Sequence, residues 1–234
     1  MDIRQNFLEP QCSPARLDIF AVRRAIVDAL RTQLPKFSGT VLDIGCGHMP
    51  YRSLVLSAPS RAEKYIGVDL KINIYRKPDL EWDGVTLPLE SSSVDIALAT
   101  ELFEHCPVPD AVMKEAFRVL RPGGLLFFTV PFLWPLHDVP HDEYRYTPFA
   151  LDRHLRGSGF TEVAIKALGG WDASLAQMIG LWVRRRPMSP RKRAIFSWLA
   201  LPIVRSLLAR DELPQLFEES SMCTGFWGTA MRPQ

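Results

Sequence analysis

Two acidic residues on either side of a glycine turn are the residues in this chain best placed to do chemistry. Asp43 precedes Gly45 and Gly47, and Asp69 ends a second apolar run 22 positions after Gly47. Glycine lets the backbone approach a ligand closely and adopt a positive φ without a Cβ clash. A carboxylate at the end of the second strand can accept hydrogen bonds from both hydroxyls of a ribose. The residues therefore predict a nucleoside-containing cofactor at the carboxyl edge of a parallel sheet.

Two cofactor classes compete for this turn. A dinucleotide site needs G-x-G-x-x-G, and here Pro50 stands where the third glycine would be. Asp43 would repel a pyrophosphate, but it would attract the cationic amino-acid part of S-adenosylmethionine. The turn therefore favours S-adenosylmethionine over NAD.

Five motifs in order, within about residues 40–160, resemble those of class I S-adenosylmethionine-dependent methyltransferases. The resemblance implies a Rossmann-like α/β fold with helices on both faces and a mostly parallel seven-stranded sheet. Its last strand is antiparallel and lies between the fifth and sixth, after a helical insertion. The sequence departs from the pattern at Met49, where many members carry a further glycine. The motifs are residues 41–47, 65–70, 80–84, 94–105 and 120–128.

The same resemblance assigns cofactor contacts to individual residues. It places some of these residues beside the methionine part of S-adenosylmethionine, others at its ribose and adenine, and one just after the fourth strand. Asp83 has an alternative interpretation as a turn residue before Gly84. The predicted cofactor-binding residues are Asp43 and Gly45 at the methionine part, Cys46 and Gly47 through backbone, Asp69 at the ribose, Leu70 and Asp83 at the adenine, and Glu101.

Histidines supply the candidate general bases for methyl transfer to a hydroxyl. His137 and His141 lie in residues 135–148, a segment dense in acids, tyrosines and histidines after the fifth strand. His105 follows the fourth strand, where the resemblance makes a cofactor-side or structural role an alternative. The segment 135–148 also supplies the predicted substrate-binding residues Tyr144, Arg145 and Tyr146.

The segment 135–148 also has a structural interpretation and a metal interpretation. Thr147 followed by Pro148 is typical of a helix N-cap with proline at the first helical position, with the tyrosines packed beneath. Metal binding by His137, Asp138, His141 and Asp142 lacks a diagnostic spacing, so no metal is expected.

Composition sets the class of protein. At 234 residues with 47% hydrophobic residues, the chain can bury a substantial core, and a net charge of +2 does not favour a polyanion partner. Four cysteines form no C-x-x-C pair, which argues against zinc and for reduced thiols. Residues 1–6 show no secretory pattern, so the expected location is cytoplasmic. The cysteines are Cys12, Cys46, Cys106 and Cys223.

Alternating apolar runs and amphipathic stretches predict strands joined by helices, hence a parallel sheet with right-handed crossovers. Ser13 and Pro14 predict the start of an amino-terminal helix that closes at Leu34 and Pro35. Strands are expected near 40–44, 64–69, 79–82, 94–99, 124–130, 160–168 and 222–231, and further helices near 51–57, 109–120 and 147–157.

Residues 171–221 are unusual because two apolar stretches flank six basic residues within 184–193. Residues 171–183 and 194–209 are each expected to be helical, and Pro202 and Arg205 argue against a membrane span. Three interpretations stay open: a cap over the substrate pocket, an interfacial helix at the inner face of the membrane through 184–209, and a nucleic-acid patch. The predicted segments are an amino-terminal helical segment (1–38), a cofactor-binding core (39–170), the insertion (171–221) and the last strand (222–234).

The function expected from these residues is O-methylation of a small molecule, glycan or glycolipid by in-line methyl transfer. The loop 137–148 and the form of the first motif resemble a bacterial subgroup that modifies surface glycans and similar products. The alternatives are N-methylation of an amino sugar or amine, a non-catalytic scaffold with the same fold, and an RNA methyltransferase. Nucleic acid is not the expected partner, and the sequence does not give the oligomeric state.

Overall fold

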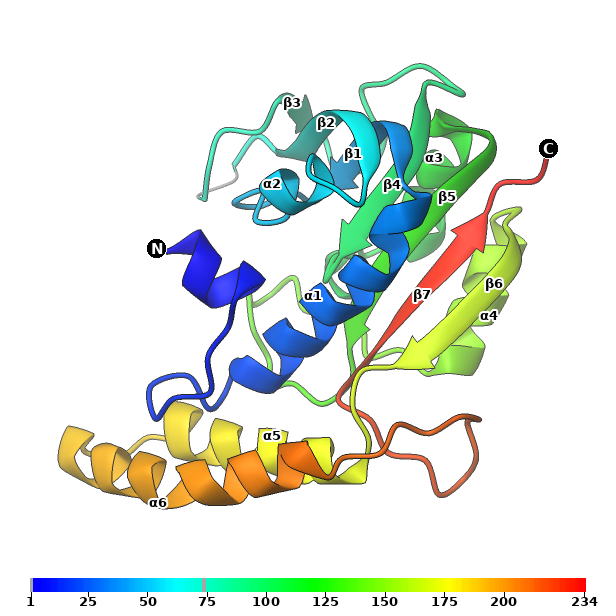
Figure 1. Ribbon diagram of the computed structural model, residues 1–234. Coiled ribbons are helices and arrows are strands. Elements are labelled where there is room, and N and C mark those ends of the chain that lie inside the picture. Colours follow the sequence, from blue (N-terminus) through cyan, green and yellow to red (C-terminus); the bar gives the residue numbers. More distant parts are fainter. Residues whose placement is uncertain (1, 73–74) are drawn as a thin grey trace. The chain divides into compact units, whose positions relative to one another are not determined.

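The computed structural model describes residues 2–72 and 75–234, which divide into two compact units (Figure 1). We call residues 29–131, 135–166 and 227–234 the sheet unit. We call residues 1–28, 132–134 and 167–226 the helical unit, of which residue 1 lies outside the described part. Each unit is described by itself below.

A seven-stranded sheet has the order β3-β2-β1-β4-β5-β7-β6. The first five strands pair in parallel; Leu42 of β1, for example, lies opposite Ile66 of β2 and Ala97 of β4. Their carboxyl ends therefore meet at one edge, where a doubly wound sheet binds its ligands. The strands are β1 (Ser38–Ile44), β2 (Arg61–Leu70), β3 (Leu80–Trp82), β4 (Val94–Thr100), β5 (Leu120–Pro131), β6 (Thr161–Ala167) and β7 (Gly225–Met231).

The last strand is antiparallel and lies between β5 and β6. The amide of Gly123 donates to the Arg232 carbonyl and the Arg232 amide donates to the Gly124 carbonyl, both at 2.9 Å. At the other end of β5 the Phe132 amide donates to the Thr224 carbonyl, so strands β5 and β7 run in opposite directions. The predicted fold class and the place of the last strand are confirmed.

The central strands are buried along consecutive residues, as in β5, where seven residues in a row from Leu125 are buried. A strand buried on successive residues is covered on both faces, because neighbouring side chains point to opposite faces. The helices α3 and α4 contact each other and lie behind the sheet in Figure 1. The predicted helices are present as α2 (Arg52–Val55), α3 (Pro109–Val119) and α4 (Pro148–Gly157).

The amino-terminal helix begins later than the sequence indicated. Helix α1 (Phe20–Gln33) starts six residues after Pro14, so the predicted start at Ser13 was wrong, although a 3₁₀ turn at Leu34–Lys36 ends it as expected. The chain before α1 bonds to another helix instead: the Asp18 carbonyl accepts from the Gln177 side chain at 2.8 Å, and the Asp18 carboxylate accepts from Arg185. Tertiary hydrogen bonds thus replace the first turns of the predicted helix. A short π-helix, Arg4–Leu8, precedes this segment.

Two adjacent helices, α5 (Trp171–Arg185) and α6 (Pro190–Ala209), dominate the helical unit. The first agrees with its prediction, and the second starts four residues before the predicted Ala194, so residues 191–193 lie in its first turns. No described helix is long and apolar enough to cross a membrane. One face of the pair packs into a core of Leu17, Ala176, Val183, Ala200, Leu201, Val204 and Leu207.

Replacing Gly180 with alanine is expected to lower the free energy of unfolding by about 1–3 kcal/mol, because added core volume forces the backbone to shift. A Cβ on Gly180 would lie 2.1 Å from the carbonyl oxygen of Leu17, a backbone atom that cannot rotate away. Gly157→Ala is the control, since a Cβ there meets nothing within 4 Å. Urea unfolding should show this variant unchanged or slightly more stable. Equal losses in both variants would contradict this account.

Candidate functional site

The turn after β1 has the backbone conformation that its glycines allow. Gly45 and Gly47 have φ values of +68° and +49°. A Cβ on Gly45 would lie 2.7 Å from the side chain of Leu102, so the turn packs against the chain that follows β4. Met49 also adopts a positive φ, +54°, although it is not glycine. The structure thus puts a methionine in the left-handed conformation at the position where the sequence departs from the motif.

The amides of this turn are bonded within the protein. Gly45 and Cys46 both donate to the Val68 carbonyl, at 2.9 and 3.1 Å, and Gly47 donates to Oδ2 of Asp69 at 2.7 Å. An anion-binding loop instead points its backbone amides at the ligand. The end of β2 therefore fixes the turn, which is poorly suited to hold a pyrophosphate.

Asp43 is a buried carboxylate at the end of β1, 1% exposed. The Tyr65 hydroxyl donates to its Oδ2, and Oδ1 accepts no hydrogen bond from the described residues. Burial raises the pKa of Asp43 to about 7, and the Tyr65 hydrogen bond opposes that rise. A buried acceptor without a donor is costly unless a ligand supplies one. The site therefore fits a cationic or hydrogen-bond-donating group.

Asp69 stands at the end of β2 as predicted. Its two oxygens accept from the amides of Gly47 and Leu70, each at 2.7 Å, which orients the carboxylate without burying it completely. Leu70 itself is exposed. Asp83 is exposed, and its Oδ1 accepts from Val85 and Thr86, which lowers the pKa of Asp83. That placement favours the turn interpretation, and its contact with an adenine stays a prediction.

The chain after β4 places two glutamates at the same edge of the sheet. Glu101 has a positive φ of +52°, and its Oε1 accepts from the Thr129 hydroxyl at 2.9 Å. Such backbone strain concentrates at functional sites. In the 3₁₀ turn Phe103–His105 that follows, the Glu104 side chain is fully buried, and neither of its oxygens has a hydrogen-bond partner among the described residues. Burial, followed by the charge of Glu101, raises the pKa of Glu104 well above its usual value.

Two of the three predicted catalytic histidines lie together. The rings of His105 and His137 are 4.8 Å apart between centroids in an edge-to-face arrangement. His105 Nδ1 lies 2.9 Å from the carbonyl oxygen of His141. His141 itself is exposed. Burial, and secondarily His105, lowers the pKa of His137. The structure thus brings His105 and His137 to one point, and His141 contributes its backbone there.

The remaining predicted residues of this loop hold it in place. Arg145 forms a two-point ion pair with Asp142, at 2.6 and 2.8 Å, and the Asp142 side chain is 2% exposed. The hydroxyls of Tyr144 and Tyr146 donate to backbone carbonyls, and Tyr146 is buried. Thr147 caps α4 by accepting from the Ala150 amide, as predicted. These contacts favour a structural role, and substrate binding by Tyr144, Arg145 and Tyr146 stays a prediction.

Two residues of the site, Tyr65 and Glu104, were not singled out from the sequence, and Asp142 was considered only as a metal ligand. Tyr65 opens the second motif, and only the pairing of Val41 with Tyr65 in adjacent strands would have placed its ring near Asp43. Glu104 precedes His105, and such a carboxylate is normally exposed, so its burial had no sequence signal.

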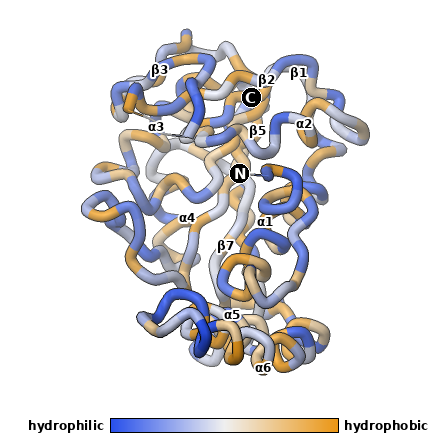
Figure 2. Tube along the Cα trace, turned by 90° about the vertical axis from the view of Figure 1, so that its left-hand side faces the viewer, coloured by the Kyte–Doolittle hydropathy of each residue, from blue (hydrophilic) through white to orange (hydrophobic). Residues whose placement is uncertain are grey.

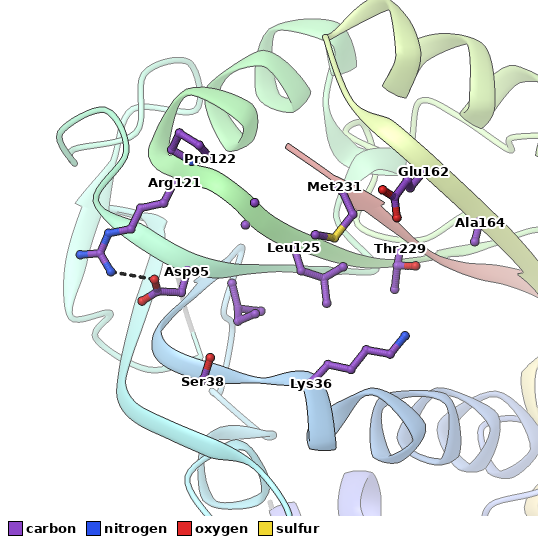
Figure 3. A pocket seen from close by; sticks show the side chains of 13 residues that line it. Lys36, Ser38, Asp95, Arg121, Pro122, Leu125, Glu162, Ala164, Thr229 and Met231 are labelled. Atoms are coloured by element: carbon purple, nitrogen blue, oxygen red, sulfur yellow. Dashed lines mark hydrogen bonds and ion pairs between the residues drawn. The ribbon is translucent and has the colours of Figure 1, made fainter. Parts of the chain in front are cut away.

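A cavity of about 490 Å³ lies at the other edge of the sheet, beside the starts of β1, β4 and β5 (Figure 3). Asp95 and Arg121 form an ion pair of 2.7 Å at its rim. None of the predicted site residues lines this cavity. It is therefore distinct from the glycine turn.

Comparisons with known proteins give a consistent result. Residues 42–128 match the family model for a methyltransferase domain. An uncharacterized methyltransferase of Mycolicibacterium paratuberculosis is 32% identical over 142 residues, 55% of this chain and 53% of that protein. A malonyl-[acyl-carrier protein] O-methyltransferase of Methylococcus capsulatus is 28% identical over 148 residues, 54% of each chain.

A solved structure of an S-adenosylmethionine-dependent methyltransferase from Thermotoga maritima superposes with a TM-score of 0.59. The two sequences are 17% identical, and the superposition covers 92% of this chain and 91% of the Thermotoga maritima chain. This likeness shows the fold. The chain spans about half the length of the first curated relatives it matches.

Proposed function

Because this chain carries a methyltransferase domain within a class I S-adenosylmethionine-dependent methyltransferase fold, we propose that it transfers a methyl group from S-adenosylmethionine to a hydroxyl of a small molecule or glycan. The observation that carries the proposal is the pair of carboxylates at the glycine turn. Asp43 offers a buried, partly unpartnered oxygen, and Asp69 offers an oriented carboxylate at the end of β2.

The residues of the turn fit this cofactor better than a dinucleotide. Asp43 would hold the ammonium of the methionine part, and Asp69 would accept hydrogen bonds from the ribose hydroxyls. The amides that a pyrophosphate would need are bonded to Val68 and Asp69. When bound, S-adenosylmethionine supplies an electrophilic methyl on a sulfonium, so the protein needs mainly to align the acceptor and remove its proton.

The loops after β4 and β5 would supply the acceptor side. His105 and His137 lie at the carboxyl edge of the sheet, where an imidazole can take the proton of an acceptor hydroxyl. His141, exposed on the same loop, is the third candidate base. The relative from Methylococcus capsulatus is an O-methyltransferase, which agrees with oxygen as the acceptor atom.

Asp69→Ala is expected to weaken binding of S-adenosylmethionine and S-adenosylhomocysteine by roughly 10- to 100-fold, the cost of hydrogen bonds to a charged group. Calorimetry on the wild type and the variant measures this directly. Asp69→Asn keeps one oxygen for the Gly47 amide, and so separates the charge from the geometry of the turn. Glu81→Ala is the control, because Glu81 lies opposite Asp69 on β3 but outside the turn. A wild type that binds neither ligand would refute the proposed function.

The helical unit supports a second part of the proposal, contact with an anionic membrane surface. The apolar residues Trp171, Leu175, Met178 and Trp182 form an exposed stripe on α5 at helical spacing. Ile195, Trp198, Leu199 and Ile203 form another on α6, and Figure 2 colours much of this pair orange. Residues of both helices line an apolar groove of about 470 Å³.

Basic residues lie at the junction of α5 and α6, after the stripe on α5 and before the stripe on α6. Arg186, Arg191 and Lys192 are exposed at the junction of α5 and α6, and Arg186 lies 4.7 Å over the Trp182 ring. Tryptophans beside arginines are typical of a helix in the headgroup region, so the occupant proposed for this surface is an anionic lipid bilayer.

Replacing Arg186, Arg191 and Lys192 together with glutamine is expected to weaken binding to phosphatidylserine-containing vesicles by on the order of 100-fold, because each basic residue near such a surface contributes about 1 kcal/mol. Sedimentation with vesicles measures this. Arg185 is left unchanged because it pairs with Asp18. Substituting the exposed Lys64, Lys71 and Lys77 instead gives the same charge change and should leave binding intact. Absent binding, or equal binding by both variants, would rule out this contact.

A further inference from the structure

Glu104, His105 and His137 form a cluster of three metal-ligating side chains in the sheet unit. Each can offer one ligand atom, and these three atoms lie within 4.8 Å of one another. This set shares only His137 with the loop residues whose spacing lacked a metal-binding pattern, His137, Asp138, His141 and Asp142. It joins two segments, the turn after β4 and the loop after β5, that only the fold brings together.

The carboxylate of Glu104 points to a ligand. Its side chain is fully buried, neither oxygen accepts a hydrogen bond from the described residues, and Oε1 lies 3.7 Å from His105 Nε2. A buried carboxyl group without a partner is unfavourable in such surroundings. Buried carboxylates are normally paired or coordinate a metal, and no other described residue pairs with this one.

Both histidines have the outer contacts of metal ligands. A carbonyl oxygen only accepts, so His105 Nδ1 must donate to the His141 carbonyl, which leaves the Nε2 lone pair facing Glu104. His137 Nδ1 lies 3.3 Å from Oδ2 of Asp142, and Arg145 holds that carboxylate in place. Metal-bound histidines commonly face a carbonyl or a carboxylate in this way, which fixes the tautomer and the ring orientation.

We infer that Glu104, His105 and His137 bind a divalent transition-metal ion of the Zn²⁺ class. Two imidazoles and one carboxylate form a donor set that suits Zn²⁺, Mn²⁺ or Fe²⁺ better than the all-oxygen sites of Mg²⁺ and Ca²⁺. Ligand atoms about 2.1 Å from a tetrahedral ion are about 3.4 Å apart, so the widest separation, 4.8 Å, would close by about 1.4 Å when the ion binds. Three protein ligands leave a position open for water or substrate.

The role of the open position rests on the proposed function, whereas ion binding does not. An acceptor hydroxyl held there would lose its proton to solvent more readily, because a bound cation lowers the pKa of a coordinated oxygen. The oxygen would then form its bond to the methyl carbon as the sulfur–carbon bond breaks, releasing S-adenosylhomocysteine. A coordinated imidazole has no free lone pair, so the ion would replace His105 and His137 as the means of activating the acceptor.

Titration of the metal-free full chain with Co²⁺ tests the inference, because cobalt in such a site gives visible d–d absorption that Zn²⁺ abolishes by competition. We expect one Co²⁺ per chain, displaced by one Zn²⁺, and an affinity at least 10-fold lower in Glu104→Gln and in His137→Ala. Glutamine preserves the shape of the buried side chain, and circular dichroism confirms that each variant folds. Calorimetry with S-adenosylhomocysteine on the same samples reports the cofactor site separately, so failure of the metal site and failure of the proposed function are distinguishable.

His154→Gln is the matched control. His154 also lies beside a carboxylate, 2.6 Å from Asp110, but outside the cluster. Binding kept in this variant and lost in the other two supports the site. No absorption in the wild type, binding unchanged in Glu104→Gln and His137→Ala, or an equal loss in His154→Gln each overturns it.

Discussion

Asp43→Asn is expected to stabilise the protein at pH 8 while weakening its hold on S-adenosylmethionine. Burial raises the pKa of Asp43 to about 7 from the ordinary aspartate value of 3.8, so above pH 7 the folded state carries a buried charge. At about 1.36 kcal/mol per pKa unit, this lowers the free energy of unfolding by up to about 4 kcal/mol. Asparagine removes the charge and keeps an oxygen for the Tyr65 hydroxyl.

The dependence on pH gives this prediction its sign. Below about pH 4 the Asp43 carboxyl is protonated in both states, and its contribution to stability is fully present. Between pH 4 and 7 the folded state keeps a proton that the unfolded state releases, so stability falls as pH rises. Urea unfolding at several pH values should show the gap between variant and wild type widening by about 2–3 kcal/mol from pH 5 to pH 8, and no further above that.

Cofactor binding should move in the opposite direction. In the proposed site only the charged form of Asp43 would attract the ammonium of the cofactor, so we expect the affinity of the wild type to rise with pH through about 7. Asp43→Asn should bind more weakly and lose this rise in calorimetry. Asp152→Asn, an exposed carboxylate on α4, serves as the control, with a stability change within about 0.5 kcal/mol. A variant as pH-dependent as the wild type would contradict the assignment to Asp43.

Arg145→Leu is expected to lower the free energy of unfolding by about 3 kcal/mol, because it leaves the buried Asp142 carboxylate without its cation. The pair of Arg156 and Asp152 is an exposed arginine–aspartate pair for comparison, in which one nitrogen of Arg156 bonds to both oxygens of Asp152 at 2.9 Å. Exposed pairs contribute little, so Arg156→Leu should cost less than about 0.5 kcal/mol. Thermal or urea unfolding of the two variants compares the stability lost with a buried and with an exposed arginine–aspartate pair.

A double variant separates the loss of the ion pair from the cost of leaving the buried Asp142 charge without a partner. Asp142→Asn combined with Arg145→Leu should recover much of the lost stability, since no buried charge then lacks a partner. The penalty of the single variant should also shrink as the pH falls toward 4. There an unpaired Asp142 takes up a proton, whereas in the wild type Arg145 keeps the pKa of Asp142 well below its usual range. A double variant no better than Arg145→Leu would show that Arg145 acts through packing instead.

The parallel part of the fold could be predicted because β1, β2, β4 and β5 each contain a run of apolar residues. The run before Gly45 and the run ending at Asp69 both form strands, which begin two to three residues earlier than expected and end within one residue of the expected positions. The start of α1 could not be predicted, because Ser13 and Pro14 carry a local helix signal. The contacts that override it, from Gln177 and Arg185, come from residues more than 150 positions away.

The candidate site shows the same division. Asp43, Gly45, Gly47 and Asp69 could be placed together from the sequence because all four lie in or beside one turn, and their role in cofactor binding stays a prediction. The meeting of Glu104 with His137 depends on where the loop after β5 comes back to the turn after β4. No local pattern specifies that return, which the Asp142–Arg145 pair and the Tyr146 hydroxyl stabilise through contacts within the fold.

The position of β7 has a consequence for the order in which the chain can fold. β5 and β6 do not pair with each other, because β7 lies between them and the helices α5 and α6 precede it in the sequence. During synthesis, one edge of β5 must therefore wait unpaired until residues 225–231 have left the ribosome. Unpaired strand edges invite intermolecular pairing. Nascent chains halted after α6 should bind chaperones and aggregate more readily than chains that already include β7.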